Sequence, residues 1–365
     1  MIGRTLSLYL AGHFLRNVLL TFGLFYTLIA AVDLIDQTRR ASRAEGGTSL
    51  DFLMISMARA GVLAENIWPF AALFGSMATL IILNRRLELV VARAAGVSAW
   101  RFLLPALATA AILGVASAAL YNPLARMAEA AGKRLEAEVY RGAARNRGAR
   151  RDFWLRTSGG DGSQVTHAAL WRERGHELTG VSRYEFDKEH RLLRRIDAAS
   201  FTLEKRRTGN VWRGTDVTVH ENGASTALAT LELAAFTTSE RLSRASTQPD
   251  DVPFWSLRQE ARAAEAAGQN PLPYATRLQA LLSRPLIFAA MVLLAGTCCL
   301  RFARFGQAAR PVALGIVAGF MLYIAAEVVL AFGRNGIVPP WMAAWGPALV
   351  ATLAGASVLL HQEDG

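Results

Sequence analysis

The chain has 365 residues, of which 52% are hydrophobic, and its mean hydropathy of +0.24 is too high for an ordinary soluble protein of this length. Its formal net charge of +11 comes almost wholly from arginine, but no aromatic and basic pattern of the kind that binds nucleic acid accompanies that charge. Only two cysteines occur, Cys298 and Cys299, and because they are adjacent they exclude a disulfide framework. The composition therefore indicates a membrane protein with arginine-rich loops.

Long apolar runs predict six membrane-spanning helices, because each is close to the ~20 residues that cross the hydrocarbon core as a helix. In chain order they cover residues 15–35, 66–83, 102–125, 278–300, 311–332 and 335–360. The first run has no cleavage site of the A-x-A kind, so we interpret it as a retained span rather than a signal peptide. Arg284 interrupts the fourth run, and the pair Pro339 and Pro340 predicts that the sixth helix starts after it.

Charged residues crowd the end of the first span. Asp33 and Asp36 are followed at once by Arg39, Arg40 and Arg43. One interpretation is local salt bridging, with Asp36 paired to Arg39 or Arg40 at helical spacing. The other is an anion site, because arginine forks match phosphate geometry and a phosphorylated lipid headgroup lies at this depth.

A short charged segment, NRRLELVVARAAGVS at 84–98, lies between the second and third spans. Four of its residues follow the spacing of one helical face: Leu87, Val90, Val91 and Ala94. Gly96 stands where a helix C-terminus prefers a left-handed residue. The segment is either a basic helix that rests on lipid headgroups or a helix that docks on a soluble motor protein.

After the third span the hydrophobicity stops for about 150 residues, and the periodicity changes to that of strands. Five strand-length segments are expected at 163–172, 178–187, 197–206, 211–221 and 224–233. Their spacing predicts a sandwich or jelly roll. Alternation predicts one set of residues facing the interior: Val165, Ala169, Leu178, Phe186, Phe201, Val211 and Leu231. Helices are expected at 124–140, entering the insertion, and at 254–268, returning from it.

Glu327 lies inside the predicted fifth span, where an ionised carboxylate is costly. It is expected either to pair with a basic residue of a neighbouring helix or to line a polar cavity. In both cases it faces the helix bundle rather than lipid.

The arginines of the short loops favour a cytoplasmic N-terminus, by eight against five. The eight on that side are Arg4, Arg85, Arg86, Arg93, Arg101, Arg301, Arg304 and Arg310, and the five opposite are Arg39, Arg40, Arg43, Arg59 and Arg334. The insertion then lies outside the cytoplasm. Tryptophans at predicted span ends fit an interfacial position: Trp68, Trp100, Trp341 and Trp345.

No catalytic constellation is found in the sequence. The six histidines are scattered without metal-ligand spacing, and neither a P-loop nor a HExxH, GxSxG or CxxC pattern occurs. We therefore expect no catalytic residue, no metal and no cofactor. If the protein performs energetic work, a partner supplies the ATPase.

The order of three spans, a strand-rich insertion and three spans resembles the LptF/LptG permease family, as does the NRRLELVVARAAGVS segment followed by WRFLLP. The resemblance covers essentially the whole chain. The loop segment and DLIDQTRR at 33–40 are closer to the LptG branch than to the LptF branch. The implied fold is an α-helical membrane protein with six transmembrane helices and an inserted periplasmic all-β jelly-roll-like domain. The expected domains are 1–140, with the coupling helix at 84–98; 141–253, the β-domain; and 254–365.

The resemblance implies a transmembrane subunit of an ABC transporter that extracts lipopolysaccharide from the inner membrane. Its expected partners are an LptB-like ATPase dimer, an LptF-like permease as heterodimer, and LptC-like and LptA-like jelly-roll proteins. The coupling helix would contact the ATPase through Glu88, with Arg85, Arg86, Leu89, Arg93 and Gly96 beside it. The resemblance maps headgroup contacts onto Arg39, Arg40 and Arg43, where the family usually has lysines. From their positions beside or within the spans we also expect Asp33, Asp36 and Glu327 at the lipid-binding site, although the two aspartates depart from the family pattern. Both termini would be cytoplasmic.

Three alternatives remain open. The nearest is the paralogous LptF subunit. A secondary transporter with Asp33 and Glu327 as a proton relay would be expected to show inverted repeats, and no convincing repeat relates the two three-span halves. A membrane-bound receptor or scaffold with a β sensor domain is the third, and copurification with an ATPase would separate the permease from both of these classes.

Overall fold

The structure of the chain, a computed structural model, describes residues 4–41, 48–96, 98–139, 149–159, 162–172, 177–187, 189, 191–206, 209–221, 224–234, 249–266, 269–302 and 309–364. It divides into two compact units. The helical unit comprises Met1–Val139, Pro253–Arg258 and Leu272–Gly365, and the β unit comprises Tyr140–Val252 and Gln259–Pro271.

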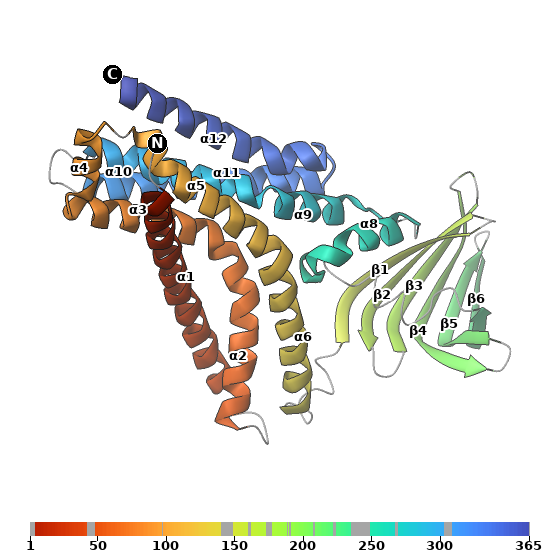
Figure 1. The fold of residues 1–365 in the computed structure, drawn as a ribbon. Coiled ribbons are helices and arrows are strands. Elements are labelled where there is room, and N and C mark those ends of the chain that lie inside the picture. The colour runs from red at the N-terminus through yellow and green to blue at the C-terminus, as the bar shows by residue number, and fades with distance from the viewer. Residues whose placement is uncertain are drawn as a thin grey trace. The chain divides into compact units, whose positions relative to one another are not determined.

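Three long helical rods form the first half of the helical unit (Figure 1). The first is α1 (Arg4–Ala41); the second joins α2 (Ser49–Ala64), a 3-10 turn η1 (Glu65–Ile67) and α3 (Trp68–Arg85); the third joins α5 (Ala99–Ala116), a π-helical turn η2 (Ser117–Tyr121) and α6 (Asn122–Val139). Their candidate spans contain 35, 37 and 38 residues. At 1.5 Å per residue, rods of this length exceed the ~30 Å hydrocarbon core by more than 20 Å. The predicted span at 102–125 and its predicted helical continuation at 124–140 together correspond to the third rod, whereas the part of the second rod before residue 66 was not predicted.

The rods extend because their polar ends bind one another. α1, α2 and α6 lie side by side (Figure 1). Arg59 on α2 donates to the Glu136 carboxylate on α6 over 2.7 Å. At the start of α2, Thr48 and Asp51 form a capping box.

The second half of the unit begins with a broken span. α9 (Leu272–Leu282) and α10 (Arg284–Phe302) meet at Ser283 with a bend of 49°. Pro285 explains the break, because proline fits the first turn of a new helix and lacks the N–H that would continue the old one. The interruption at Arg284 is thus a real change of direction.

Two further spans follow, α11 (Ala309–Arg334) and α12 (Pro340–Asp364), the latter starting at the second proline of the pair. Among the described residues, five helices are long and apolar enough to cross a membrane, or six with the bent pair counted as one span. This confirms the six-span prediction.

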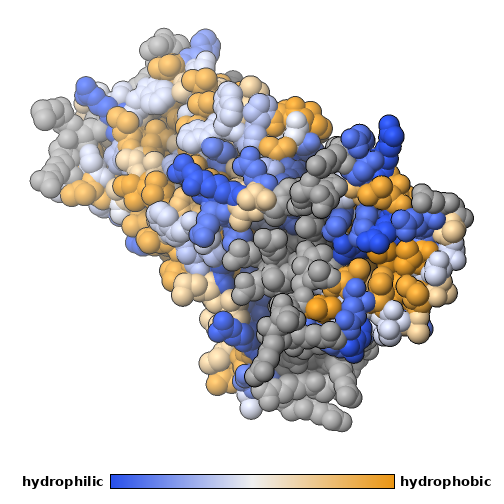
Figure 2. All heavy atoms as spheres, turned by 90° about the vertical axis from the view of Figure 1, so that its right-hand side faces the viewer, coloured by the Kyte–Doolittle hydropathy of each residue, from blue (hydrophilic) through white to orange (hydrophobic). Residues whose placement is uncertain are grey.

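A hydrophobic core holds these helices together, and it includes Phe14 and Val18 of α1, Leu73 of α3, Leu103 of α5 and Phe288 of α10. Many large hydrophobic residues remain exposed on the outer faces, and the face in Figure 2 shows hydrophobic residues at the surface in many places between hydrophilic ones. On α1 these include Leu20, Leu24, Leu28 and Val32, which recur at one helical spacing. In a membrane such faces contact lipid or another helix.

The described strands of the β unit form one antiparallel sheet in the order β1-β2-β3-β4-β5-β6, which is curved (Figure 1). The strands are β1 (Ala149–Gly159), β2 (Gly162–Arg172), β3 (Glu177–Phe186), β4 (Leu192–Arg206), β5 (Gly209–Glu221) and β6 (Ala224–Ala234). The all-β insertion and its five predicted strands are confirmed. β1, which is rich in arginine, was not predicted. The helix expected at 124–140 is α6, and that at 254–268 corresponds to the turn η6 (Phe254–Ser256) and α8 (Leu257–Ala266).

Alternation within the strands reverses halfway along the sheet. Leu178 and Val181 are both buried although they are three positions apart, which puts residues of a regular strand on opposite faces, and Gly180 between them has φ +62. The same reversal separates Ala198 from Phe201, and on β5 it occurs next to Asp216, which has φ +49. The kinks in β3, β4 and β5 lie at positions that pair with one another across the sheet. The buried residues on both sides of the kinks therefore face the same inner side of the sheet.

This reversal decides which predicted interior residues are correct. Leu178 and Phe201 are fully buried, and Leu231 packs against the core. Ala169 is exposed while its neighbour Ala168 is buried, and Val165, Phe186 and Val211 each stand next to a buried residue on the opposite side. These four predictions were wrong by one position. Alternation divides the residues of a strand into two sets on opposite faces, but it does not say which of the two sets faces the interior.

Candidate functional site

The loop between the second and third spans folds as α4 (Glu88–Ala94), which is shorter than the predicted helix at 84–98. α3 continues to Arg85, and Leu87 has φ 60, a left-handed conformation that separates the two helices. Gly96 has φ +79, which confirms its predicted place as the left-handed residue after the helix. The side chain of Arg93 and residue Val97 lie outside the described residues.

α4 attaches to the bundle by one residue and leaves its apolar face open. Leu89 is buried in the helical core, whereas Leu87, Val90 and Val91 have exposed fractions of 61%, 52% and 66%. The Glu88 carboxylate accepts a hydrogen bond from the Tyr9 hydroxyl of α1, with O–O distances of 3.1 and 3.2 Å. α4 therefore presents a positioned carboxylate beside an uncovered apolar patch.

The acidic and basic residues predicted at the end of the first span all lie on α1 where they are described. Asp33 is half-buried, while Asp36 and Arg39 are exposed. The side chain of Arg40 and all of Arg43 lie outside the described residues. Glu327 is not part of this group, because it lines a cavity elsewhere in the unit whose described lining contains no residue of α1.

The most strongly buried charges of the helical unit surround Glu65, a residue that the sequence reasoning missed. Glu65 stands in η1, at the junction of α2 and α3, and only 1% of it is exposed. Its Oε1 accepts from Arg284 at 2.6 Å and from Arg277 at 2.9 Å, and its Oε2 accepts from Arg126 at 2.9 Å. One carboxylate thus joins α6, α9 and α10 to the second rod.

Neutral groups complete this cluster. Asn122 donates from Nδ2 to Glu65 Oε1 over 2.9 Å, and its Oδ1 accepts the backbone N–H of Phe254 over 2.8 Å. The π-helical turn η2 precedes Asn122, and its Tyr121 hydroxyl donates to the Gly61 carbonyl over 2.6 Å. The bulge in the helix therefore places a phenol and an amide on the face that meets η1.

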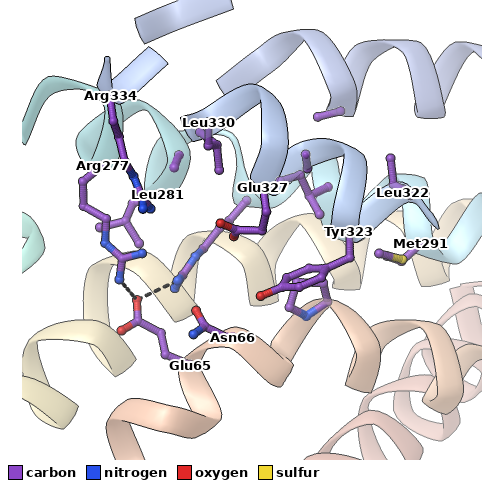
Figure 3. A pocket seen from close by; sticks show the side chains of 16 residues that line it. Glu65, Asn66, Arg277, Leu281, Met291, Leu322, Tyr323, Glu327, Leu330 and Arg334 are labelled. Carbon is purple, nitrogen blue, oxygen red and sulfur yellow. Dashed lines mark hydrogen bonds and ion pairs between the residues drawn. The ribbon is translucent and has the colours of Figure 1, made fainter. Parts of the chain in front are cut away.

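Beside the cluster lies a small cavity of about 80 Å³ (Figure 3). Its polar lining comprises Glu65, Asn66, Arg277, Arg284, Tyr323, Glu327 and Arg334. Glu327 thus lines a cavity that is polar in part, and its expected role in lipid binding stays a prediction. Figure 3 shows Glu327 and Arg334 of α11 pointing into the same space as Arg277 and Glu65.

The inner face of the β unit also carries buried charge. Arg183 donates from Nε to Glu185 at 2.9 Å and from Nη2 to the Gln164 side-chain oxygen at 2.8 Å, and Arg194 donates to the second Glu185 oxygen at 2.6 Å. Burial lowers the pKa of Arg183 from its ordinary value, although the Glu185 carboxylate opposes that shift. The apolar inner face thus has a polar region across β2, β3 and β4.

Among the described residues, no group of three or more histidines, cysteines or acidic residues is arranged to hold a metal. A sequence model of the family described as "Lipopolysaccharide export system permease LptF/LptG" matches residues 8–361, which span both units. The chain belongs to the LptF/LptG permease family. Members of this family are transmembrane subunits of an ABC transporter and do not carry the ATPase themselves.

Two similar proteins are the LptG permeases of Escherichia coli K12 and of Escherichia coli O6:H1. Each is 24% identical to this chain over 360 residues, which cover 94% of both sequences. The predicted family is therefore confirmed over the full length. The roles assigned to Glu88, to the α1 charges and to Glu327 stay predictions for this LptF/LptG permease.

Proposed function

We propose that this chain is the LptG-type permease, which works with an LptF-like permease and an LptB-like ATPase dimer to extract lipopolysaccharide from the inner membrane. The observation that carries the proposal is the match to two LptG proteins over 94% of each chain. The same assembly with this chain in the LptF position is the second candidate, since the family matched contains both subunits.

The exposed face of α4 is the surface for the ATPase. Within its described residues α4 is anchored by Leu89 and by the Tyr9–Glu88 hydrogen bond, and it leaves Leu87, Val90 and Val91 uncovered, as expected of a surface for a partner protein. Glu88 would pair with a basic group of the ATPase, with Arg85, Arg86 and Arg93 around it. Movement of the ATPase would then reach α1 through Tyr9.

The membrane path would run along α1 and α11, whose uncovered apolar faces need a partner. On α11 this face comprises Val317, Phe320, Met321, Ile324 and Val328. Removal of a lipid from the bilayer costs about 0.8 kcal/mol for each buried CH₂ group, so an apolar cavity and ATP hydrolysis are both needed. Arg39, Arg40 and Arg43 would bind the headgroup phosphates at the end of α1, with Asp33 and Asp36 beside them.

The β unit would receive the lipid on its inner face. Its described edge strands are β1 and β6, which can pair with the edges of LptC-like and LptA-like domains. The arginine distribution favours cytoplasmic termini and α4. This orientation makes the β unit periplasmic.

The ATPase surface leads to the first prediction. Glu88→Gln should leave the permease in the membrane and weaken its retention of the ATPase after mild detergent extraction. We expect a loss of about 2 kcal/mol in association, because truncating one partner of a charge pair at an interface typically costs that much or more. Quantitative copurification of the ATPase and of the second permease measures it.

Glu189→Gln is the matched control, since it removes the same charge from an exposed turn of the β unit. Tyr9→Phe should give a smaller loss than Glu88→Gln, because it only frees the carboxylate. Copurification of the ATPase at the wild-type level with Glu88→Gln would refute the coupling role. A retained partner of LptG type would assign this chain to the LptF position.

The lipid path leads to the second prediction. Photocrosslinkers at Val219 and Leu231, which are half-buried on the inner face of the sheet, should capture lipopolysaccharide when the ATPase hydrolyses ATP. Crosslinkers at Ala169 and Val211, one position off that face, serve as controls and should capture none. Capture that is equal on both faces or independent of ATP would contradict a lipid path through the sheet.

A further inference from the structure

Two helix faces meet at the small cavity beside Glu65. From the broken span come residues spaced three and four apart, Arg277, Leu281, Arg284 and Met291. From α11 come Leu322, Tyr323, Glu327, Leu330 and Arg334 with the same periodicity. Each face is polar at one end and apolar at the other. The lining is therefore suited to a ligand with a polar group and an apolar part.

The polar end lies close to one membrane boundary. α3 starts three residues after Glu65 and its 18 residues rise roughly 27 Å, so Glu65 is nearly a full hydrocarbon thickness from Arg85 and α4. Arg334 is the last residue of α11, and Arg277 lies in the first two turns of α9. The cavity therefore opens at headgroup depth on the side of the membrane opposite α4.

The charges in the cavity are of both signs. Arg277 and Arg284 share a single oxygen of Glu65. Among the described residues, Glu327 and Arg334 make neither an ion pair nor a hydrogen bond, although both point into the cavity (Figure 3). Charges held between membrane helices are costly without a partner, so a ligand that satisfies both signs would be favoured.

The arrangement selects against ligands with one sign of charge. A simple anion would bind to the arginines but would also meet the Glu327 carboxylate. A simple cation would bind Glu327 but would meet three guanidinium groups. A phosphate joined to a primary ammonium satisfies both ends, because arginine forks donate to phosphate oxygens and the ammonium donates to Glu327 and to the Tyr323 hydroxyl oxygen.

We propose that this cavity binds the zwitterionic headgroup of a phospholipid that carries a phosphate and a primary ammonium, as in phosphatidylethanolamine. With about 80 Å³ of space the cavity admits a small polar group and excludes a whole lipid. The acyl chains therefore remain in the bilayer. The cavity is lined in part by α11, which also bounds the proposed transport path, but the proposal rests on the lining of the cavity and not on that path.

The proposal is tested by native mass spectrometry of the full chain in its complex, after incubation with vesicles of defined composition. The unmodified protein should retain phosphatidylethanolamine at least about fivefold more than phosphatidylglycerol, which lacks the ammonium. It should also prefer it to phosphatidylcholine, whose quaternary nitrogen has no hydrogen to donate. These two comparisons need no variant and therefore do not depend on the folding of a mutant.

Variants locate the site. Glu327→Gln should abolish the preference for phosphatidylethanolamine over phosphatidylglycerol, and Arg334→Gln should reduce the retention of both lipids. Arg59→Gln is the matched control, because it removes an arginine of the helical unit that does not line the cavity. Equal retention of the three lipids, or an unchanged preference in Glu327→Gln, would overturn the proposal. Displacement of phosphatidylethanolamine by lipopolysaccharide from the unmodified protein would place the cavity in the transport path instead.

Discussion

Replacing Glu65 with leucine is expected to destabilise the helical unit more than any other single change of charge. The carboxylate forms ion pairs with Arg126, Arg277 and Arg284 at distances of 2.6–2.9 Å, and its loss removes the acidic partner that these three buried guanidinium groups share, although Arg126 keeps an ion pair with Glu129 at 3.3 Å. Breaking a buried ion pair by removing one partner costs about 3–5 kcal/mol. Such a loss is comparable to the whole stability of many domains, so little folded protein should accumulate.

Membrane accumulation and thermal unfolding in detergent measure this effect. Glu136→Gln is the matched control, since Glu136 binds Arg59 at 2.7 Å but is 23% exposed, and a pair of that kind contributes about 1 kcal/mol or less. A fourfold variant that replaces Glu65 and its three arginines with leucine should recover much of the lost stability, because no buried charge remains. Wild-type accumulation and unfolding of the single Glu65→Leu variant would show that the cluster does not hold the helices together.

The spans could be predicted from the sequence because each is a local property of about 20 apolar residues. Of their extensions, the helix at 124–140 was predicted, but the one at Ser49–Ala64 was not. The stretch from Ser49 to Ala64 carries Arg59, and the stretch from Asn122 to Val139 carries several charges, so hydropathy alone places both outside the membrane. In the structure both stretches continue the helices, and Arg59 of one stretch pairs with Glu136 of the other, which is 77 residues away.

The cluster around Glu65 was missed for the same physical reason. Each of the four charged residues of the cluster lies in a stretch of sequence that is apolar or mixed. The arginines that bind Glu65 are 61 to 219 residues away from it in the sequence. One signal was available in the sequence, because Glu65 and Arg284 are single charged residues beside or within predicted spans. A charged side chain at such a position is costly unless it is paired. Arg284 was noted only as an interruption, and Glu327, which was singled out for its cost, does line the same cavity.

The sequence predicted the left-handed backbone of a single residue more reliably than it predicted the length of a helix. Gly96 was expected to be left-handed and is, but the left-handed Leu87 that shortens α4 has no signature in its residue type. In the β unit the segments with strand composition became strands. Their faces were partly wrong, because the kink at Gly180 reverses the alternation and the sequence shows no equivalent glycine in β4.

A close contact between α5 and α10 leads to the last prediction. At Gly114 an added Cβ would come within 2.6 Å of the Pro285 backbone nitrogen and 3.0 Å of the Arg284 carbonyl carbon. Backbone atoms cannot rotate aside as a side chain can, so Gly114→Ala must push the two helices apart. The displaced segment carries Arg284, whose guanidinium binds Glu65 and the Ser117 carbonyl. Overpacking of this kind costs about 1–3 kcal/mol, and more where it also disturbs a buried ion pair.

Gly12→Ala on α1 is the matched control, because a Cβ there meets no atom within 4 Å. In that position alanine should stabilise the helix by about 0.5–1 kcal/mol, since glycine loses more conformational freedom on folding. The two substitutions are chemically identical and should shift thermal unfolding in opposite directions. If Gly114→Ala unfolds at or above the temperature of Gly12→Ala, the close approach of α5 to Pro285 does not constrain the bundle, and the break between α9 and α10 can move without releasing Arg284 from Glu65.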